Sequence, residues 1–236
     1  MKKSKLTKAL LVTLCAVLLV AGSVLGTLAY LTARTEVVEN TFTVGDVQIS
    51  LDEVVVNPDG TPVDGNGDGS YDREEKGNEY HLVPGKTYPK DPTVTVKGKS
   101  EPSYVRMMVT INCISELKAI FGKDFLPQNY VAGWYPEKWE CVSTVENDDD
   151  NTVTYEFRYH SVVDASGSDA DITLEPLFTH FTIPGEVDNA QLKTIDALEI
   201  AVEGHAIQAA TFVDDEVTGT SAEDAAWAAF DKQVNP

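Results

Sequence analysis

The sequence predicts an all-β protein, built as an antiparallel β-sandwich with one or two short helices. Many short segments carry β-branched and aromatic residues, Pro and Gly separate them at short intervals, and only two short stretches have helical spacing. The best-defined strand pair is Thr93–Val96 followed by Tyr104–Cys113. The second strand alternates between a face expected to join the core and a face nearer water; the core face has Val105, Met107, Val109 and Ile111, the other Arg106, Met108, Thr110 and Asn112.

The remaining elements follow from the same patterns. In the segment Thr41–Leu51 the apolar residues occupy even positions before Gly45-Asp46 and odd positions after it. This one-residue shift predicts a strand with a bulge at the glycine. Further strands are expected at Lys138–Val145, Thr152–Ser161, Leu177–Ile183 and Ala197–Phe212, the first two forming a hairpin around an acidic turn. Helices are expected at Ser115–Phe121, with Ser115 as a candidate N-cap, and at Ser221–Lys232, with a capping-box-like start.

The N-terminus has the pattern of an export signal. Four lysines precede an uncharged run from Ala9 to Ala33, and its small residues Thr27 and Ala29 predict cleavage between Ala29 and Tyr30. The alternative is a retained anchor, because 25 uncharged residues are long enough to span a bilayer. We therefore expect a signal peptide at 1–29 and one sandwich domain at 30–236, secreted or held at the cell surface, with membrane contact only through an uncleaved leader.

The net charge of −20 argues against binding to nucleic acid, since phosphate backbones attract basic surfaces. The histidines stand alone, without an H-E-x-x-H motif or Cys/His spacing for zinc, and neither a G-x-S-x-G motif nor a phosphate-binding glycine loop is present. The sequence therefore indicates a protein that is not an enzyme.

An insertion at 57–80, rich in Asp, Gly and Asn, carries a calcium-loop pattern. Six residues match positions one, three, five, seven, nine and twelve of an EF-hand loop, with Gly69 at the sixth position: Asp64, Asn66, Asp68, Ser70, Asp72 and Glu75. Such spacing lets hard oxygen ligands converge on one Ca²⁺ ion. The alternative is a turn-rich loop between strands, because the prolines around it do not favour flanking helices.

Of the three cysteines, Cys15 belongs to the leader, so the mature chain keeps Cys113 and Cys141. An oxidising exterior permits a disulfide between them. Two free thiols behaving as small apolar side chains are the alternative, and the sequence does not decide between the two.

Four pieces in order resemble the TasA/camelysin family: the leader, the segment GTLAYLTARTEVVENTFTVGDVQISL, the block PGKTYPKDPTVTVKG with YVRMMV, and HAIQAATF before an alanine- and tryptophan-containing helix. The resemblance implies export with processing by a SipW-type signal peptidase in a Gram-positive host, and a jelly-roll-like β-sandwich. It also implies subunits of biofilm-matrix fibres, in which an N-terminal strand passes to a neighbouring subunit.

Three hypotheses follow for the function. The first is an exported structural protein that self-associates into filaments by donating the strand at Thr41–Leu51. The second is a monomeric secreted or wall-associated calcium-binding module. The third, a camelysin-like hydrolase, is the weakest because the sequence offers no metal ligands for it.

Overall fold

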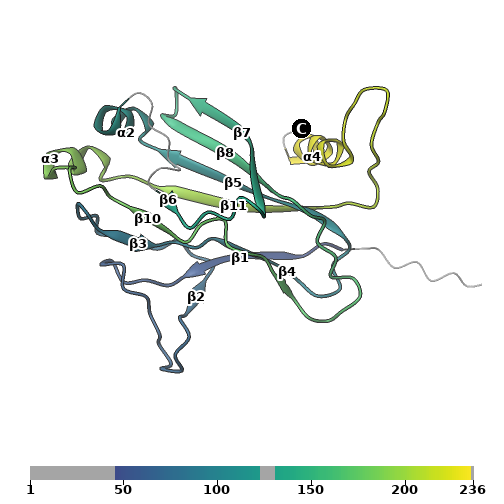
Figure 1. Ribbon diagram of the computed structural model, residues 1–236, viewed down its shortest axis with the longest axis horizontal. Helices are drawn as coiled ribbons and strands as arrows, with labels where there is room; N and C mark the ends of the chain where they lie inside the picture. Colours follow the sequence, from purple (N-terminus) through teal and green to yellow (C-terminus); the bar gives the residue numbers. More distant parts are fainter. Residues whose placement is uncertain (1–45, 123–130, 235–236) are drawn as a thin grey trace, which may run out of the picture. The chain divides into compact units, whose positions relative to one another are not determined.

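The computed structural model describes residues 46–122 and 131–234, and it confirms an all-β, sandwich-like fold with few helices. Its three antiparallel sheets have the strand orders β2-β1-β4-β9, β3-β10-β6 and β11-β5-β8-β7 (Figure 1). The strands are β1 (Ile49–Val54), β2 (Arg73–Glu74), β3 (Thr87–Pro89), β4 (Thr93–Val96), β5 (Ser103–Asn112), β6 (Val131–Ala132), β7 (Trp139–Asn147), β8 (Thr152–Tyr159), β9 (Ile172–Thr173), β10 (His180–Thr182) and β11 (Ile200–Gln208).

The helices are short: α2 (Ile114–Phe121), α3 (Asn189–Leu192), the 3₁₀ turn η2 (Lys193–Ile195) and α4 (Ala222–Val234). The sequence did not predict α3, although Asp188 and Gln191 form a reciprocal capping box there. The prediction of Ser115 as the N-cap of α2 was wrong. Cys113 holds that position in a left-handed conformation without a side-chain cap, and Ser115 donates its N–H to Asn151 Oδ1.

The strand expected at Thr41–Leu51 was placed too early. Within the described residues it begins at Ile49 and continues to Val54, because the pairing of β1 with β4 runs from Ile49–Val96 to Asp52–Thr93. Gly45 of the expected bulge lies outside the described residues. So do the leader and the predicted cleavage site at Ala29 and Tyr30.

The core lies where the β4 and β5 sheets face each other. All four residues of β4 are buried, and the four apolar residues predicted for the inner face of β5 are at most 5% exposed. Rings from the β3-β10 pair extend this core, with Tyr88 stacked on Phe181 at 5.2 Å between ring centroids. None of the described helices is long and apolar enough to cross a membrane.

The adjacent methionines of β5 test which face of the strand forms the core. Met107 is fully buried, whereas Met108 is half-buried on the opposite face. We expect Met107→Ala to lower the free energy of unfolding by about 2–5 kcal/mol, the usual cost of a large core truncation. Met108→Ala, the matched control, should cost less than half as much in urea titrations. Equal losses would contradict the assigned faces.

Candidate functional site

A groove of about 1180 Å³ lies along the side of the sandwich where β1 and β11 lie. Its walls come from β1, the segment 74–84, the α3–η2 region and the first half of β11. The lining is mixed: it includes the large apolar residues Leu51, Leu82, Phe181, Leu192, Ile195, Leu198, Ile200 and Val202, and the acidic residues Asp52, Glu53, Glu74, Glu75, Glu79, Asp196, Glu199 and Glu203. This volume exceeds the roughly 300–1,000 Å³ of typical small-molecule pockets, so the groove is large enough for an extended peptide segment.

The groove closes where β11 approaches the opposite sheet at Gly204. A Cβ atom at this position would lie 3.2 Å from Val94 Cγ2, 3.6 Å from Ile49 Cδ1 and 3.7 Å from Leu51 Cβ. A glycine here lets the two sheets come together closely. Along β11 the groove lining runs from Ile200 to Glu203 and ends before Gly204.

One wall of the groove is an edge strand with unpaired backbone groups. The Glu199 carbonyl accepts from the Asn112 N–H and Ala209 donates to the Pro102 carbonyl, so odd-numbered residues of β11 make the hydrogen bonds to β5. Even-numbered residues must turn their N–H and C=O groups away from β5. These groups of Ile200, Val202, Gly204 and Ala206 have no backbone partner within the described ranges.

The opposite wall has a shorter edge of the same kind. Gln48 accepts from the Lys97 N–H, so even-numbered residues of β1 bond to β4 and odd-numbered ones face away from it. The next strand, β2, pairs only with Glu53 and Val54. The backbone groups of Ile49 and Leu51 therefore stay without a strand partner among residues 46–122 and 131–234.

The other edge of the β11-β5-β8-β7 sheet is protected by its sequence. Strand β7 has a register irregularity between Cys141 and Ser143, and it exposes the acidic Glu140 and Glu146. Bulges and charges at an edge prevent pairing with another chain. Strand β11 has one acidic residue, Glu203, and no irregularity in its nine paired positions. The sheet therefore favours strand addition at β11 over β7.

One end of the groove carries a buried ion pair. Lys90 donates to Glu53 Oε2 at 2.7 Å, and both side chains are 8% exposed. Asn78 donates its backbone N–H and its side-chain amide to Glu53 Oε1 at 3.1 and 3.0 Å. Burial, and then the negative charge of Glu53, raise the pKa of the nearby Tyr80. This network fixes the 74–84 segment to β1, because removing one partner of a buried pair leaves the other charge uncompensated.

The predicted calcium loop hangs between β1 and β2, and no helix flanks it within the described chain (Figure 1). Its Asp64 carboxylate accepts from the N–H groups of Gly67, Asp68 and Gly69, while Asp72 accepts from Gly65. The other predicted ligands are Asn66, Asp68, Ser70 and Glu75, of which Glu75 lines the groove. The described residues include no group of three or more His, Cys, Asp or Glu side chains arranged to hold a metal.

The structure contains Cys113 and Cys141 as free thiols. Cys141 pairs with Phe157, which pairs with Met107, and Cys113 follows Met107 by six positions. At about 3.3 Å per residue the two cysteines are about 20 Å apart along the sheet, whereas a disulfide needs Cα atoms within about 7 Å. The free-thiol alternative therefore describes this fold.

Comparison with known proteins gives no family assignment: no protein family, curated protein or solved structure matches this chain. Sequence reasoning missed the groove, since its lining comes from five separate stretches. The available signal was the run Ile200–Gln208, a strand with one acid and a central glycine, which is atypical of a guarded edge.

The two thiols should react at different rates. Cys141 is exposed, whereas Cys113 is half-buried and its thiol pKa is raised by burial and then by Glu116 and Asp196. A higher pKa leaves less thiolate, the reactive form, at pH 8. We expect iodoacetamide to modify Cys141 first, with peptide mass spectrometry as the readout and Cys141→Ser as the control. Two unreactive cysteines that are freed by reductant would indicate a disulfide.

Proposed function

We propose that this chain is an exported structural protein whose subunits associate when an N-terminal strand of one subunit enters the β1–β11 groove of the next. The observation that carries the proposal is that the even-numbered residues of β11, which borders the groove, have backbone N–H and C=O groups without a backbone partner in the described chain. A strand added there gains main-chain hydrogen bonds and side-chain pockets together. The lysine-rich leader and the resemblance to TasA/camelysin proteins support export, and suggest a signal peptidase as a transient partner.

The donated strand is shorter than the sequence pattern first indicated. Ile49 and Leu51 pair within their own sheet, and the carbonyls of Asp46 and Gln48 accept N–H groups of the 97–101 segment of the same subunit, so the donated residues precede Asp46. The segment TFTVG, residues 41–45, supplies the apolar side chains of Phe42 and Val44 and carries no charge. Donation from one subunit to the next is heterologous and does not close, and it therefore produces filaments.

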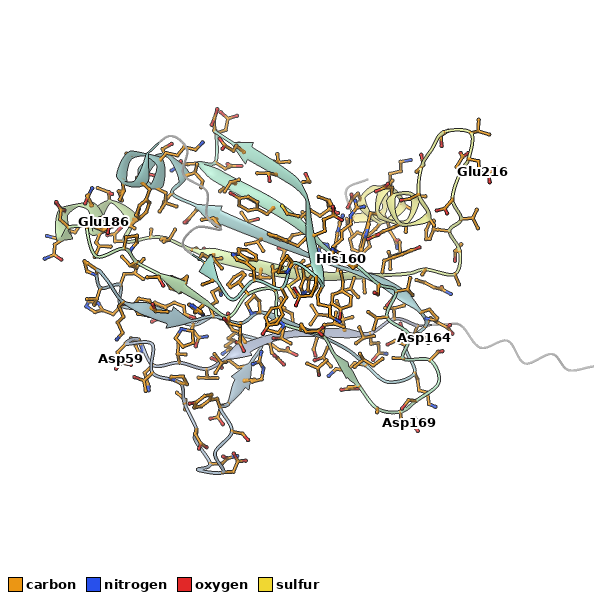
Figure 2. All side chains as sticks on the ribbon, viewed as in Figure 1. Asp59, His160, Asp164, Asp169, Glu186 and Glu216 are labelled. Atoms are coloured by element: carbon orange, nitrogen blue, oxygen red, sulfur yellow. The ribbon has the colours of Figure 1, made fainter. Side chains whose placement is uncertain are left out.

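Charge opposes this association. The acidic side chains labelled in Figure 2, Asp59, Asp164, Asp169, Glu186 and Glu216, are exposed in several separate loops, and the net charge is −20. Subunits with so much negative charge repel one another unless salt, acid or a divalent cation reduces the repulsion. We therefore expect assembly outside the cell to depend on ionic conditions.

Deletion of residues 1–44 should prevent filament growth while leaving β1 intact. The point variant Val202→Glu should weaken growth at least tenfold by placing a charge in the groove. Val145→Glu, on the β7 edge of the same sheet and 60% exposed in the parent protein, is the matched control and should assemble normally. Electron microscopy and light scattering at raised salt are the readouts, with circular dichroism to verify folding.

A peptide of residues 38–48 separates donation from other routes of assembly. It should bind the deleted protein and fail to bind the deleted protein that also carries Val202→Glu. Filaments formed by the deleted protein as readily as by the full chain would overturn the proposal. Equal growth of the Val202→Glu and Val145→Glu variants would do the same.

Calcium binding by the insertion is a second proposed function. It is favoured by Gly69, which occupies the sixth position of the loop with φ +88°, since EF-hand loops need glycine at their sharp turn. Because the described conformation does not gather the ligands, Glu75 must move from the groove wall toward Asp64 when the ion binds. Extracellular calcium is sufficient for a weak site of about 10⁻⁴–10⁻³ M.

Millimolar Ca²⁺ should therefore raise the melting temperature. Binding to the native state adds about 1.4 kcal/mol at ten times Kd, and the double variant Asp64→Ala, Glu75→Gln should lose this increment. Asp148→Asn, Asp149→Asn makes the same change in charge on the exposed β7–β8 turn and should keep it. If wild-type melting is unmoved by calcium and by chelator, the loop is only a turn.

A further inference from the structure

Helix α4 lies on the outer face of the β11-β5-β8-β7 sheet, where it covers a buried arginine. The Arg106 side chain is 4% exposed and lies on the face that the sequence predicted to be nearer water. Its guanidinium carbon lies 4.5 Å from the centroid of the Trp227 ring and 5.1 Å from that of Phe230. It donates Nη2–H to Asp231 at 2.5 Å. Arg106 therefore binds α4 by charge and by stacking.

The protonation state of His205 is set by this arginine. Arg106 donates its Nε–H to His205 Nδ1 at 3.2 Å, and a nitrogen that accepts cannot carry a proton. The imidazole must then be neutral with its proton on Nε2, which lies 3.6 Å from Glu203. The His205 ring also packs against Phe230 of α4, with 4.9 Å between centroids. One histidine thus contacts both the arginine and the helix.

The remaining contacts of α4 are two buried side chains and one further ion pair. Trp227 and Ala226 are its buried residues, and Asp224 accepts from Arg158 at 2.6 Å. The loop 209–221 that leads to the helix is mostly exposed, with Val213 and Val217 at 78% and 94%. No described strand pairs with α4, so the helix can leave while the three sheets keep their hydrogen bonds.

We propose that α4 is a pH-responsive latch, which is closed while His205 is neutral and is released when His205 takes up a proton. The protonated ring loses the hydrogen bond from Arg106 and places a second positive charge against the guanidinium. Protonation therefore weakens the contacts that Arg106 and His205 make with α4. When the helix leaves, the outer face of the sheet is exposed. This inference is independent of strand addition at the groove on the edge of the sandwich.

The surrounding charges determine the pH range. Burial, and then the charge of Arg106, lower the pKa of His205, whereas Glu203 of β11, Asp231 of α4 and Glu156 of β8 oppose this shift. Since the closed state has the lower pKa, its stability is full above about pH 6.5 and is lost as the pH falls through the lowered value.

Hydrogen exchange of residues 222–234, corrected for the intrinsic rate at each pH, measures the opening equilibrium directly. For one linked proton we expect opening to rise by up to about tenfold per pH unit below pH 6.5. His205→Gln, which can accept from Arg106 but cannot take up a proton, should abolish this slope. His160→Gln removes an exposed histidine after β8 and should keep it (Figure 2). Asp231→Asn should open the helix more at pH 7.5.

Three results would overturn the latch. They are a wild-type protein without a pH slope between 5 and 6.5, the same slope in His205→Gln, and loss of the slope in His160→Gln. Helix α2, which follows the end of β5 away from the Arg106–His205 pair, is the internal reference, and its exchange should not follow the exchange of α4. If α2 and α4 opened together, the change would be global unfolding rather than release of a latch.

Discussion

The structure depends on how each sheet edge satisfies its backbone hydrogen bonds. An edge strand presents N–H and C=O groups that require water, a neighbouring strand or a cover, and an uncovered edge is a site for pairing with another chain. In this protein β7 is protected by a register irregularity and acidic residues, whereas β11 keeps an uninterrupted register with β5 and carries one acid. The groove lies beside β11, so both the apolar surface and the open backbone occur on one side of the sandwich.

Much of the fold was predictable because local pattern and tertiary environment agree. The alternation in β5 gave its inner face correctly, and the β-branched run Thr93–Val96 is β4 with the same bounds. The outer face of β5 was misjudged at Arg106, because the helix that covers it lies more than one hundred positions later. The start of β1 at Ile49 is likewise set by pairing with β4, which a single strand pattern does not contain.

The candidate site was less accessible to sequence reasoning. Its polar end joins Glu53, Asn78 and Lys90, and each of these looks like an ordinary surface residue when read alone. The calcium loop is the opposite case. Its sequence matches a strong linear motif, but in the structure Asp64 accepts hydrogen bonds from its own loop. Residues that meet through folding leave little periodic signal, while a linear motif shows ligand types without showing their convergence.

Buried charges attach two covering segments to this sandwich. Glu53 and Lys90 hold the groove wall, and Arg106 holds α4, each in a setting where an unpaired charge is costly. A segment held by an ion pair can detach when one charge of the pair is neutralised or meets a like charge. A segment held by apolar packing does not respond to charge in this way. The sandwich therefore combines a permanent apolar core with segments whose attachment depends on charge.

The central claim, that β11 accepts a strand from a neighbouring subunit, is tested most directly by residue-resolved hydrogen exchange in monomer and filament. The account predicts that the amides of Ile200, Val202 and Gly204 exchange rapidly in the monomer and become protected by at least a hundredfold in the filament. The odd-numbered amides between them, of Ala201 and Glu203, are bonded to β5 and should be protected in both states. Even-numbered amides that stay unprotected in filaments would contradict the account.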